Sequence, residues 1–300
     1  MQSFSRGWSF LKQAWQMAVK DKDLIKPSIM ALFAGFVVSI IFIPLMVGAG
    51  FLTGGDNSLV GRVALFVLGA VMIFIQYTVG YVFSAMTVYL VYDYLTEGDG
   101  VMSKAWAVVK RDFFDLMSLA AASTAVNLLK SGVRGKGRSG GRNMLAGLID
   151  TVWTEAAFLI LPAMVIEDIS LTNALKRAGS IIKNNLLLVG ISTVGVKTVN
   201  GLIGFLLGAL GIGLGFGVGF GIITVTNASA LATFGLVSGI GLGVFIAGIF
   251  IMVATVVTSY TTTAYHTCLY LWARDVEKAQ ASGSNVQVMA PAPLAAVLNR

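Results

Sequence analysis

The sequence predicts an all-helical membrane protein in which six transmembrane helices form three hairpins, each preceded by an amphipathic surface helix. Three observations support this fold class. Hydrophobic residues make up 56% of the 300 residues, charged residues make up only 12%, and the mean hydropathy is +0.83. A soluble chain of this length would not hide so much apolar surface in one core. The apolar residues also gather in runs that are long enough to cross a bilayer.

Three amphipathic segments are predicted to lie on the membrane surface, one ahead of each hairpin. In the first segment, residues 1–26, Trp8 and Trp15 share one helical stripe while basic residues lie elsewhere. Residues 105–111 and 170–183 repeat this pattern. The similarity indicates either an internal repeat or the likeness that all amphipathic surface helices share for physical reasons.

Six apolar runs are predicted to span the membrane. The run over 113–129 is the weakest because Asp115 interrupts it. The last run, 231–272, would measure about 63 Å as a helix, so part of it must tilt or leave the membrane. Residues 1–280 are expected to form a single domain and residues 281–300 a mobile cytoplasmic tail. The predicted spans are residues 28–51, 63–92, 113–129, 144–166, 185–210 and 231–272.

Glycine-rich segments are predicted at the tips of the second and third hairpins. Residues 211–221 alternate glycine with apolar residues, and the polar residues 224–229 follow. The gaps between these glycines lack the polar residues that a phosphate-binding loop needs, so a flexible tip is expected. The tip over 130–143 is basic. Either the second hairpin crosses fully despite this charge, or it is re-entrant and never crosses.

Other glycines of the third hairpin predict close helix packing. Gly235, Gly239 and Gly243 recur at every fourth position, as in a glycine zipper, and therefore share one helical face. Gly204 and Gly208 belong to a small and polar face of the preceding span. We expect this hairpin to mediate homo-oligomer formation or to join a larger membrane complex.

Basic residues predict the orientation of the chain. Lysine and arginine gather beside the apolar runs on the side that holds both termini, so both termini are expected in the cytoplasm, with the chain in a prokaryotic inner membrane. The net charge of +7 is spread over short flanks. This distribution favours anionic lipid headgroups as partners and does not favour nucleic acid.

Charged side chains inside the spans need a partner, because each costs about 2.5–3.5 kcal/mol at bilayer depth. Glu155 and Lys197 lie at similar depths in their spans, so an ion pair between them is predicted. Three interpretations are open: the pair joins two helices, it belongs to a proton or ion relay, or the two residues do not meet. The candidate polar path also includes Gln76, Asp150, Asn200 and His266.

The sequence contains few residues that could form a metal, disulfide or catalytic site. His266 is the only histidine and Cys268 the only cysteine, so neither a histidine-rich metal site nor a disulfide framework is expected. No catalytic triad or cofactor loop can be assembled from the polar residues, so we expect neither an enzyme nor a bound cofactor.

Three short motifs carry a resemblance. The segment 20–27, the segment 161–177 and the closing segment 265–273 resemble a prokaryotic family of six-span integral membrane proteins of unassigned function. The resemblance covers nearly the whole chain. It implies the six-span layout but supplies no activity, substrate or site residues. The leading interpretation is therefore a non-enzymatic membrane protein with an assembly role, and the alternative is a pore-forming channel or a transporter of ions or small solutes.

Overall fold

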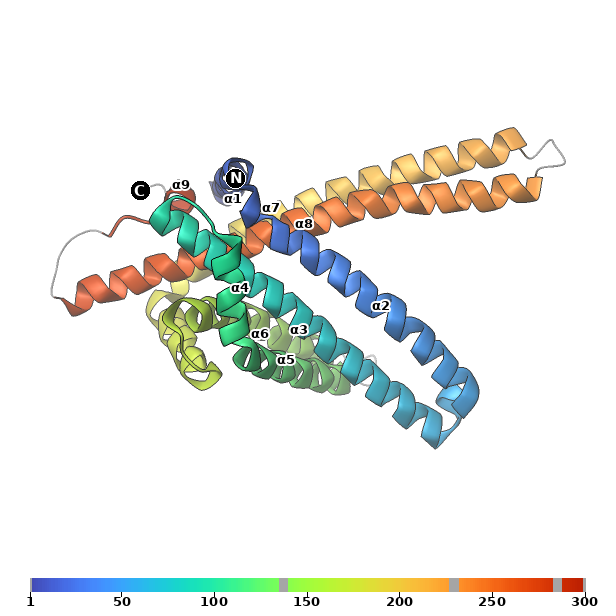
Figure 1. Cartoon of the computed structure of the whole chain (residues 1–300), viewed down its shortest axis with the longest axis horizontal. Coiled ribbons are helices and arrows are strands. Elements are labelled where there is room, and N and C mark those ends of the chain that lie inside the picture. Colours follow the sequence, from blue (N-terminus) through green and yellow to red (C-terminus); the bar gives the residue numbers. More distant parts are fainter. Residues whose placement is uncertain (1, 135–139, 227–231, 283–287, 299–300) are drawn as a thin grey trace.

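The computed structural model describes residues 2–134, 140–226, 232–282 and 288–298, and these residues contain helices but no strand (Figure 1). The all-helical class is therefore confirmed. In chain order the helices are α1 (Gln2–Lys20), α2 (Lys26–Thr53), α3 (Leu59–Glu97), α4 (Met102–Arg111), α5 (Phe113–Arg134), α6 (Gly140–Glu167), α7 (Leu171–Thr226), α8 (Ala232–Ala281) and α9 (Ala292–Leu298). Short 3-10 turns, Lys22–Leu24 and Gly55–Asn57, precede α2 and α3.

Within the described residues, five helical segments are long and apolar enough to cross a membrane, as expected of a multi-pass membrane protein. The predicted third span, now α5, is not among them, because its sequence mixes serine, threonine and asparagine with small apolar residues. The inner face of α5 is packed, with Leu116 and Leu119 fully buried. The five segments are Lys22–Thr53, Leu59–Glu97, Ile149–Glu167, Val196–Val225 and Leu236–Ala281.

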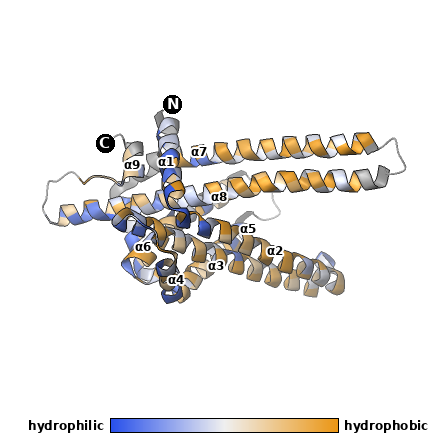
Figure 2. Ribbon diagram, turned by 45° about the horizontal axis from the view of Figure 1, so that its top comes forward, coloured by the Kyte–Doolittle hydropathy of each residue, from blue (hydrophilic) through white to orange (hydrophobic). Residues whose placement is uncertain are grey.

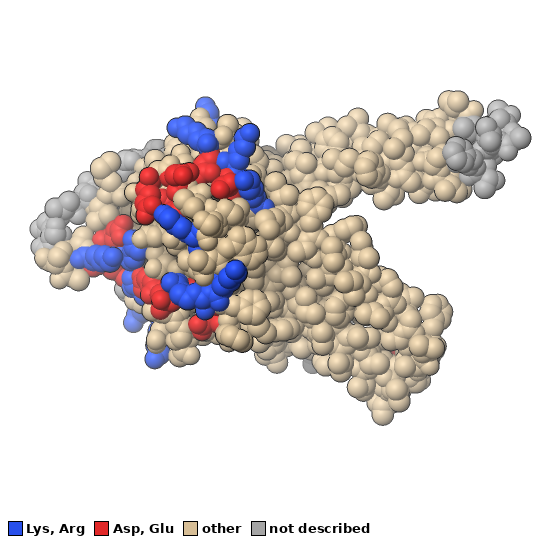
Figure 3. Space-filling view, viewed as in Figure 1, with Lys and Arg blue, Asp and Glu red and all other residues tan. Residues whose placement is uncertain are grey.

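Two arms project from a packed base (Figure 1). One arm consists of α2 and α3, the other of the tip-side halves of α7 and α8, and the two arms diverge from each other. Both arms are strongly hydrophobic along their length (Figure 2). The space-filling view shows an uncharged notch between them, while the charged residues on this face gather at the opposite end (Figure 3).

The base holds the hydrophobic core. Its largest side chains come from α1, α3, α5, α6 and α8. The first helix is part of this core: the Tyr260 hydroxyl of α8 donates to the Ala14 carbonyl at 3.0 Å, and the rings of Phe10 and Tyr265 meet edge to face. Of the stripe that was predicted to face the membrane, Trp8 remains exposed, whereas Leu11 is buried in the protein.

The structure differs from the prediction over residues 211–221, which do not form a tip. These residues continue α7 as a regular helix to Thr226, and α7 begins at Leu171, so the third lead helix and the fifth span are continuous. Inside a bilayer a helix satisfies every backbone hydrogen bond internally, which outweighs the low helix propensity of glycine.

The glycines of α7 and α8 face each other across the second arm. A Cβ atom added to Gly239 would lie 2.6 Å from the carbonyl oxygen of Gly219, and one added to Gly243 would lie 2.7 Å from that of Gly215. Gly239 and Gly243 therefore pack against α7 of the same chain. The surroundings of Gly235 lie outside the described residues.

The chain end also differs in part from the predicted mobile tail. Helix α9 packs on α1, and its Leu294 is fully buried. Proline at position 293 suits the first turn of a helix, and even a short helix can be held when one large side chain enters the core.

Candidate functional site

Three helices bring their charged or titratable side chains together beside the base of the second arm. Glu155 of α6 forms an ion pair with Lys197 of α7, and its second carboxylate oxygen lies 3.4 Å from Nε2 of His266 on α8. The other ring nitrogen of His266, Nδ1, lies 2.7 Å from the backbone carbonyl oxygen of Thr262, so it must carry the proton and donate. We call Glu155, Lys197 and His266 the charged cluster.

Helical spacing explains why neighbouring residues support this cluster. Asn200 lies three residues after Lys197, and its amide donates to the Thr262 hydroxyl at 3.0 Å. Phe158 lies three residues after Glu155, and its ring stacks on that of His266 with centroids 4.5 Å apart. Asn200 is almost fully buried. The aromatic ring thus supports one face of the imidazole, and the amide ties α7 to the Thr262 residue whose carbonyl meets Nδ1.

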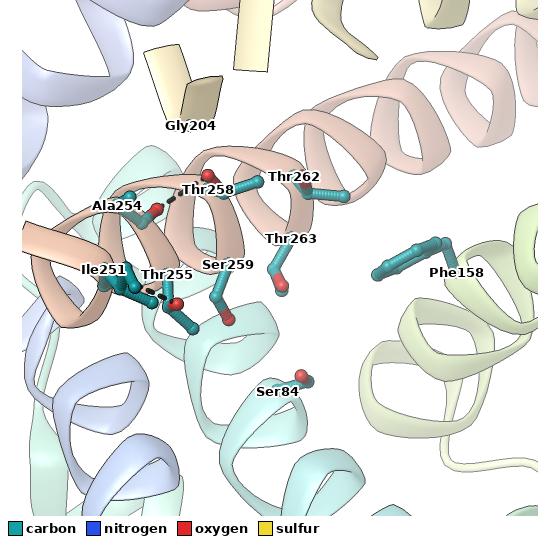
Figure 4. A pocket seen from close by; sticks show the side chains of 10 residues that line it. All are labelled: Ser84, Phe158, Gly204, Ile251, Ala254, Thr255, Thr258, Ser259, Thr262 and Thr263. Carbon is teal, nitrogen blue, oxygen red and sulfur yellow. Dashed lines mark hydrogen bonds between the residues drawn. The ribbon is translucent and has the colours of Figure 1, made fainter. Parts of the chain in front are cut away.

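A pocket of about 560 Å³ adjoins the charged cluster (Figure 4). Its lining comes from α3, α6, α7 and α8, and Phe158 and Thr262 belong both to this lining and to the surroundings of His266. Gly204 supplies the α7 wall, where the missing side chain leaves open space. The hydroxyl-bearing residues of the lining are Ser84, Thr255, Thr258, Ser259, Thr262 and Thr263.

Some of these hydroxyls are already used by the helix that carries them. Thr255 and Thr258 donate to backbone carbonyls one turn earlier, at 2.8 and 2.7 Å. Ser84, Ser259 and Thr263 make no side-chain hydrogen bond to any described residue of the chain. Figure 4 shows Ser259 and Thr263 on the side of α8 that faces Ser84. These three hydroxyls are therefore available to a bound molecule.

The burial of the cluster is uneven. The side chain of His266 is 3% exposed and that of Glu155 21%, whereas the side chain of Lys197 is 44% exposed. A lysine in an apolar span is stable only when its charge is balanced or reaches water. Here the Glu155 carboxylate is the partner of the Lys197 charge, and its second oxygen also faces His266.

Two residues of the predicted polar path lie elsewhere. Asp150 forms an ion pair with Lys130 at 2.6 Å, between α5 and α6. The Gln76 amide donates to the Gly35 carbonyl at 3.0 Å and approaches the Ser39 hydroxyl at 3.1 Å, so it joins α2 to α3. The structure therefore brings Glu155, Lys197, Asn200 and His266 together, but not Asp150 or Gln76.

Sequence reasoning did not pair His266 with an acid. Its carboxylate partner, Glu155, lies 111 residues away in the chain, and no local pattern links them. Phe158 and Thr263 were also missed. Phe158 lies three residues after Glu155 and Thr263 lies four residues after Ser259, so helical spacing places each of them on the same face as its polar neighbour.

The charged end of the molecule carries separate ion pairs, whose basic members Lys104 and Arg177 lie outside the five candidate membrane-spanning segments. Lys104 of α4 contacts Glu97 at 2.7 Å and Asp93 at 3.2 Å, and these carboxylates raise the pKa of Lys104. Arg177 of α7 pairs with Glu277 and with Glu167; burial opposes its charge, yet the bond to Glu277 raises the pKa of Arg177. These pairs hold α4 on α3, and α7 on α6 and α8.

The described residues offer no metal site, because no three histidine, cysteine, aspartate or glutamate side chains come together in them. Cys268 is buried as a free thiol. No protein-family model matches the sequence, and no curated protein matches it. The charged cluster and the pocket beside it are therefore the observations from which a function must be argued.

Proposed function

We propose that this protein is a membrane carrier that binds a charged or polar molecule in the pocket beside Glu155, Lys197 and His266 and moves it through the bilayer. The observation that carries the proposal is the meeting of these three side chains from three helices next to a pocket whose hydroxyls are partly unused. Ionisable groups within membrane spans are rare and mark substrate or ion pathways.

The features of the site favour a carrier over a pair that only joins helices. A pair that only joins two helices needs no third titratable group. Here a third titratable group faces Glu155, and Lys197 keeps 44% of its side-chain surface exposed. A pocket with a few convergent polar groups is also the usual form of a small-molecule site.

The proposal includes the topology of the chain. We propose that α5 and α6 form a second hairpin, which completes six spans, and that the chain lies in a prokaryotic inner membrane with both termini in the cytoplasm. The gathering of charge at one end of the molecule supports this orientation (Figure 3). The basic residues at that end would then contact anionic headgroups.

A flux assay tests the proposal. The protein is reconstituted in liposomes, and movement of protons, Na⁺, K⁺, small carboxylates and a fluorescently labelled anionic phospholipid is followed. We expect at least one of these to move faster than in protein-free liposomes, and Glu155→Gln to reduce that rate at least tenfold. The double variant Glu155→Gln, Lys197→Met should recover the thermal midpoint lost in the single variant, but not the flux.

The second ion pair provides a matched control. Asp150→Asn with Lys130→Met removes a pair of the same kind outside the charged cluster, and it should leave the rate unchanged. If the Glu155 and Lys197 double variant transports at the original rate, the pair is only structural. Equal movement with and without protein, for every compound, also rejects the proposal.

A second candidate is the assembly role, for which the outer side of the second arm is the specific observation. Gly213, Gly217 and Gly221 lie opposite the glycines that contact α8, and an added Cβ would meet nothing within 4 Å. Exposed Phe216 and Phe220 lie beside them. Close approach of another helix would use this face. Gly217→Leu should then abolish self-association measured by light scattering in detergent, and an unchanged particle mass would reject this role for the face.

A further inference from the structure

The hydroxyls that line the pocket along α8 differ in their bonding. Thr262, Thr263 and Ser259 lie toward the base. Thr258 and Thr255 follow, with hydroxyls that donate within the helix, and Ala254 and Ile251 lie at the other end. The tip-side half of α8 is hydrophobic (Figure 2). A molecule that fits this pocket along its length therefore needs a polar end and an apolar end.

The pocket lies between helices of both arms. Its walls come from α3 of the first arm, from α7 and α8 of the second, and from α6 of the base. On the face seen in Figure 3, no charged residue lines the notch between the arms. Both arms also expose large apolar side chains, such as Phe36 and Phe245. Walls of this kind are wetted by lipid chains rather than by water.

The polar end offers one partly exposed cationic side chain, Lys197. Lys197 and His266 face the single carboxylate of Glu155, and Lys197 is the most exposed of the three. Lys197 also lies seven residues, or about two helical turns, before Gly204, so both lie on the same face of α7 as the pocket. The hydroxyls of Ser84, Ser259 and Thr263, which make no hydrogen bond among the described residues, can donate to the oxygens of an anion.

We propose that the pocket binds a membrane lipid with an anionic headgroup, which enters sideways from the bilayer through the notch. The headgroup lies near Lys197 and the free hydroxyls, and the chains lie between the arms. This inference rests on the proposed function in that it assigns the class of molecule that the same pocket carries.

Native mass spectrometry of the full chain in a neutral detergent tests the ligand class without any variant. The probes are phosphatidylglycerol, phosphatidylcholine with the same chains, and glycerol 3-phosphate, which has an anionic phosphate but no chains. We expect one phosphatidylglycerol per chain, bound at least tenfold more tightly than either of the others. Equal binding of phosphatidylcholine would show that the pocket does not require an anionic headgroup. Equal binding of glycerol 3-phosphate would show that it does not require lipid chains. Either result overturns the inference.

Two substitutions test the location. Gly204→Leu adds a side chain at the pocket wall, where a Cβ meets nothing within 4 Å, and it should weaken phosphatidylglycerol binding at least tenfold. Lys197→Met should abolish the preference over phosphatidylcholine. Gly179→Leu, at an equally open position on the same helix but outside the pocket lining and outside the face of Gly213, Gly217 and Gly221, is the control and should bind as before. Unchanged binding in Gly204→Leu overturns the assigned site.

The binding result is separate from the flux result. A chain that binds phosphatidylglycerol in the pocket but moves none of the tested compounds leaves this inference in place and rejects the proposed carrier function. A chain that moves an ion or a small carboxylate but does not bind phosphatidylglycerol does the reverse.

Discussion

The two arms are closed by opposite means. In the second arm, α7 and α8 meet glycine to glycine, so that their backbones nearly touch at Gly219 with Gly239 and at Gly215 with Gly243. In the first arm, α2 and α3 are bridged by a polar side chain, since the Gln76 amide reaches the Gly35 carbonyl at 3.0 Å. Contact between the helices depends on the absence of side chains in the second arm and on the amide of Gln76 in the first.

This difference shows how helices associate without a hydrophobic driving force. Lipid chains are as apolar as leucine, so burying apolar surface between helices gains little in a bilayer. What remains is close van der Waals contact, which small residues allow, and hydrogen bonding, which polar residues supply. The arm of α7 and α8 should therefore be sensitive to added volume, and the arm of α2 and α3 to loss of a polar group.

The largest expected effect is that of adding volume to the glycine-closed arm. In Gly239→Leu the new Cβ would lie 2.6 Å from the Gly219 carbonyl oxygen and 2.8 Å from Cγ1 of Ile223. Because the first of these atoms is backbone, the helices must separate. We expect a loss of about 3 kcal/mol, the upper end for overpacking, seen as a lower thermal midpoint in detergent.

Gly241→Leu is the matched control, because this glycine lies on the other side of α8 with no atom within 4 Å of an added Cβ. It should leave the midpoint within experimental error. Leucine has a higher helix propensity than glycine, so propensity cannot destabilise either variant. Equal destabilisation by the two substitutions would mean that contact between α7 and α8 does not set the effect.

The comparison also shows which parts of this fold can be predicted from sequence. Helices α2 and α3 follow from uncharged runs of sufficient length, and the depth of Glu155 and Lys197 in their spans is enough to expect that they meet. The first inference uses only the length of an apolar run. The second adds to the depth of each residue only the expectation that consecutive spans of the chain are neighbours.

The parts that could not be predicted depend on that knowledge. The spacing of Gly239 and Gly243 indicates a face for close packing, but it does not say whether the other helix belongs to the same chain, as the structure has it. The glycines of 211–221 resemble a loop when they are judged by helix propensity in water, yet their contacts with α8 and the bilayer favour a helix. His266 likewise meets its acid only because α6 and α8 pack together.

A smaller effect is expected from the amide-closed arm. Gln76→Leu keeps the volume of the side chain but removes the hydrogen bonds to α2. Interhelical hydrogen bonds in membrane proteins average about 0.6 kcal/mol and reach about 1.7, because the separated helices find other partners. We expect a loss of about 1 kcal/mol in the same thermal measurement, well below that of Gly239→Leu.

Thr78→Val on the same helix is the control, because the Thr78 hydroxyl donates to the Phe74 carbonyl within α3 and not to α2. Its effect should be close to zero. The order of the two effects is the result that tests the comparison. Volume added between touching backbones forces the helices apart, whereas the methyl groups of leucine can occupy the place of the lost amide. If Gln76→Leu destabilises the protein more than Gly239→Leu does, the hydrogen bond between α2 and α3 stabilises its arm more than the glycine contact between α7 and α8 stabilises the other arm.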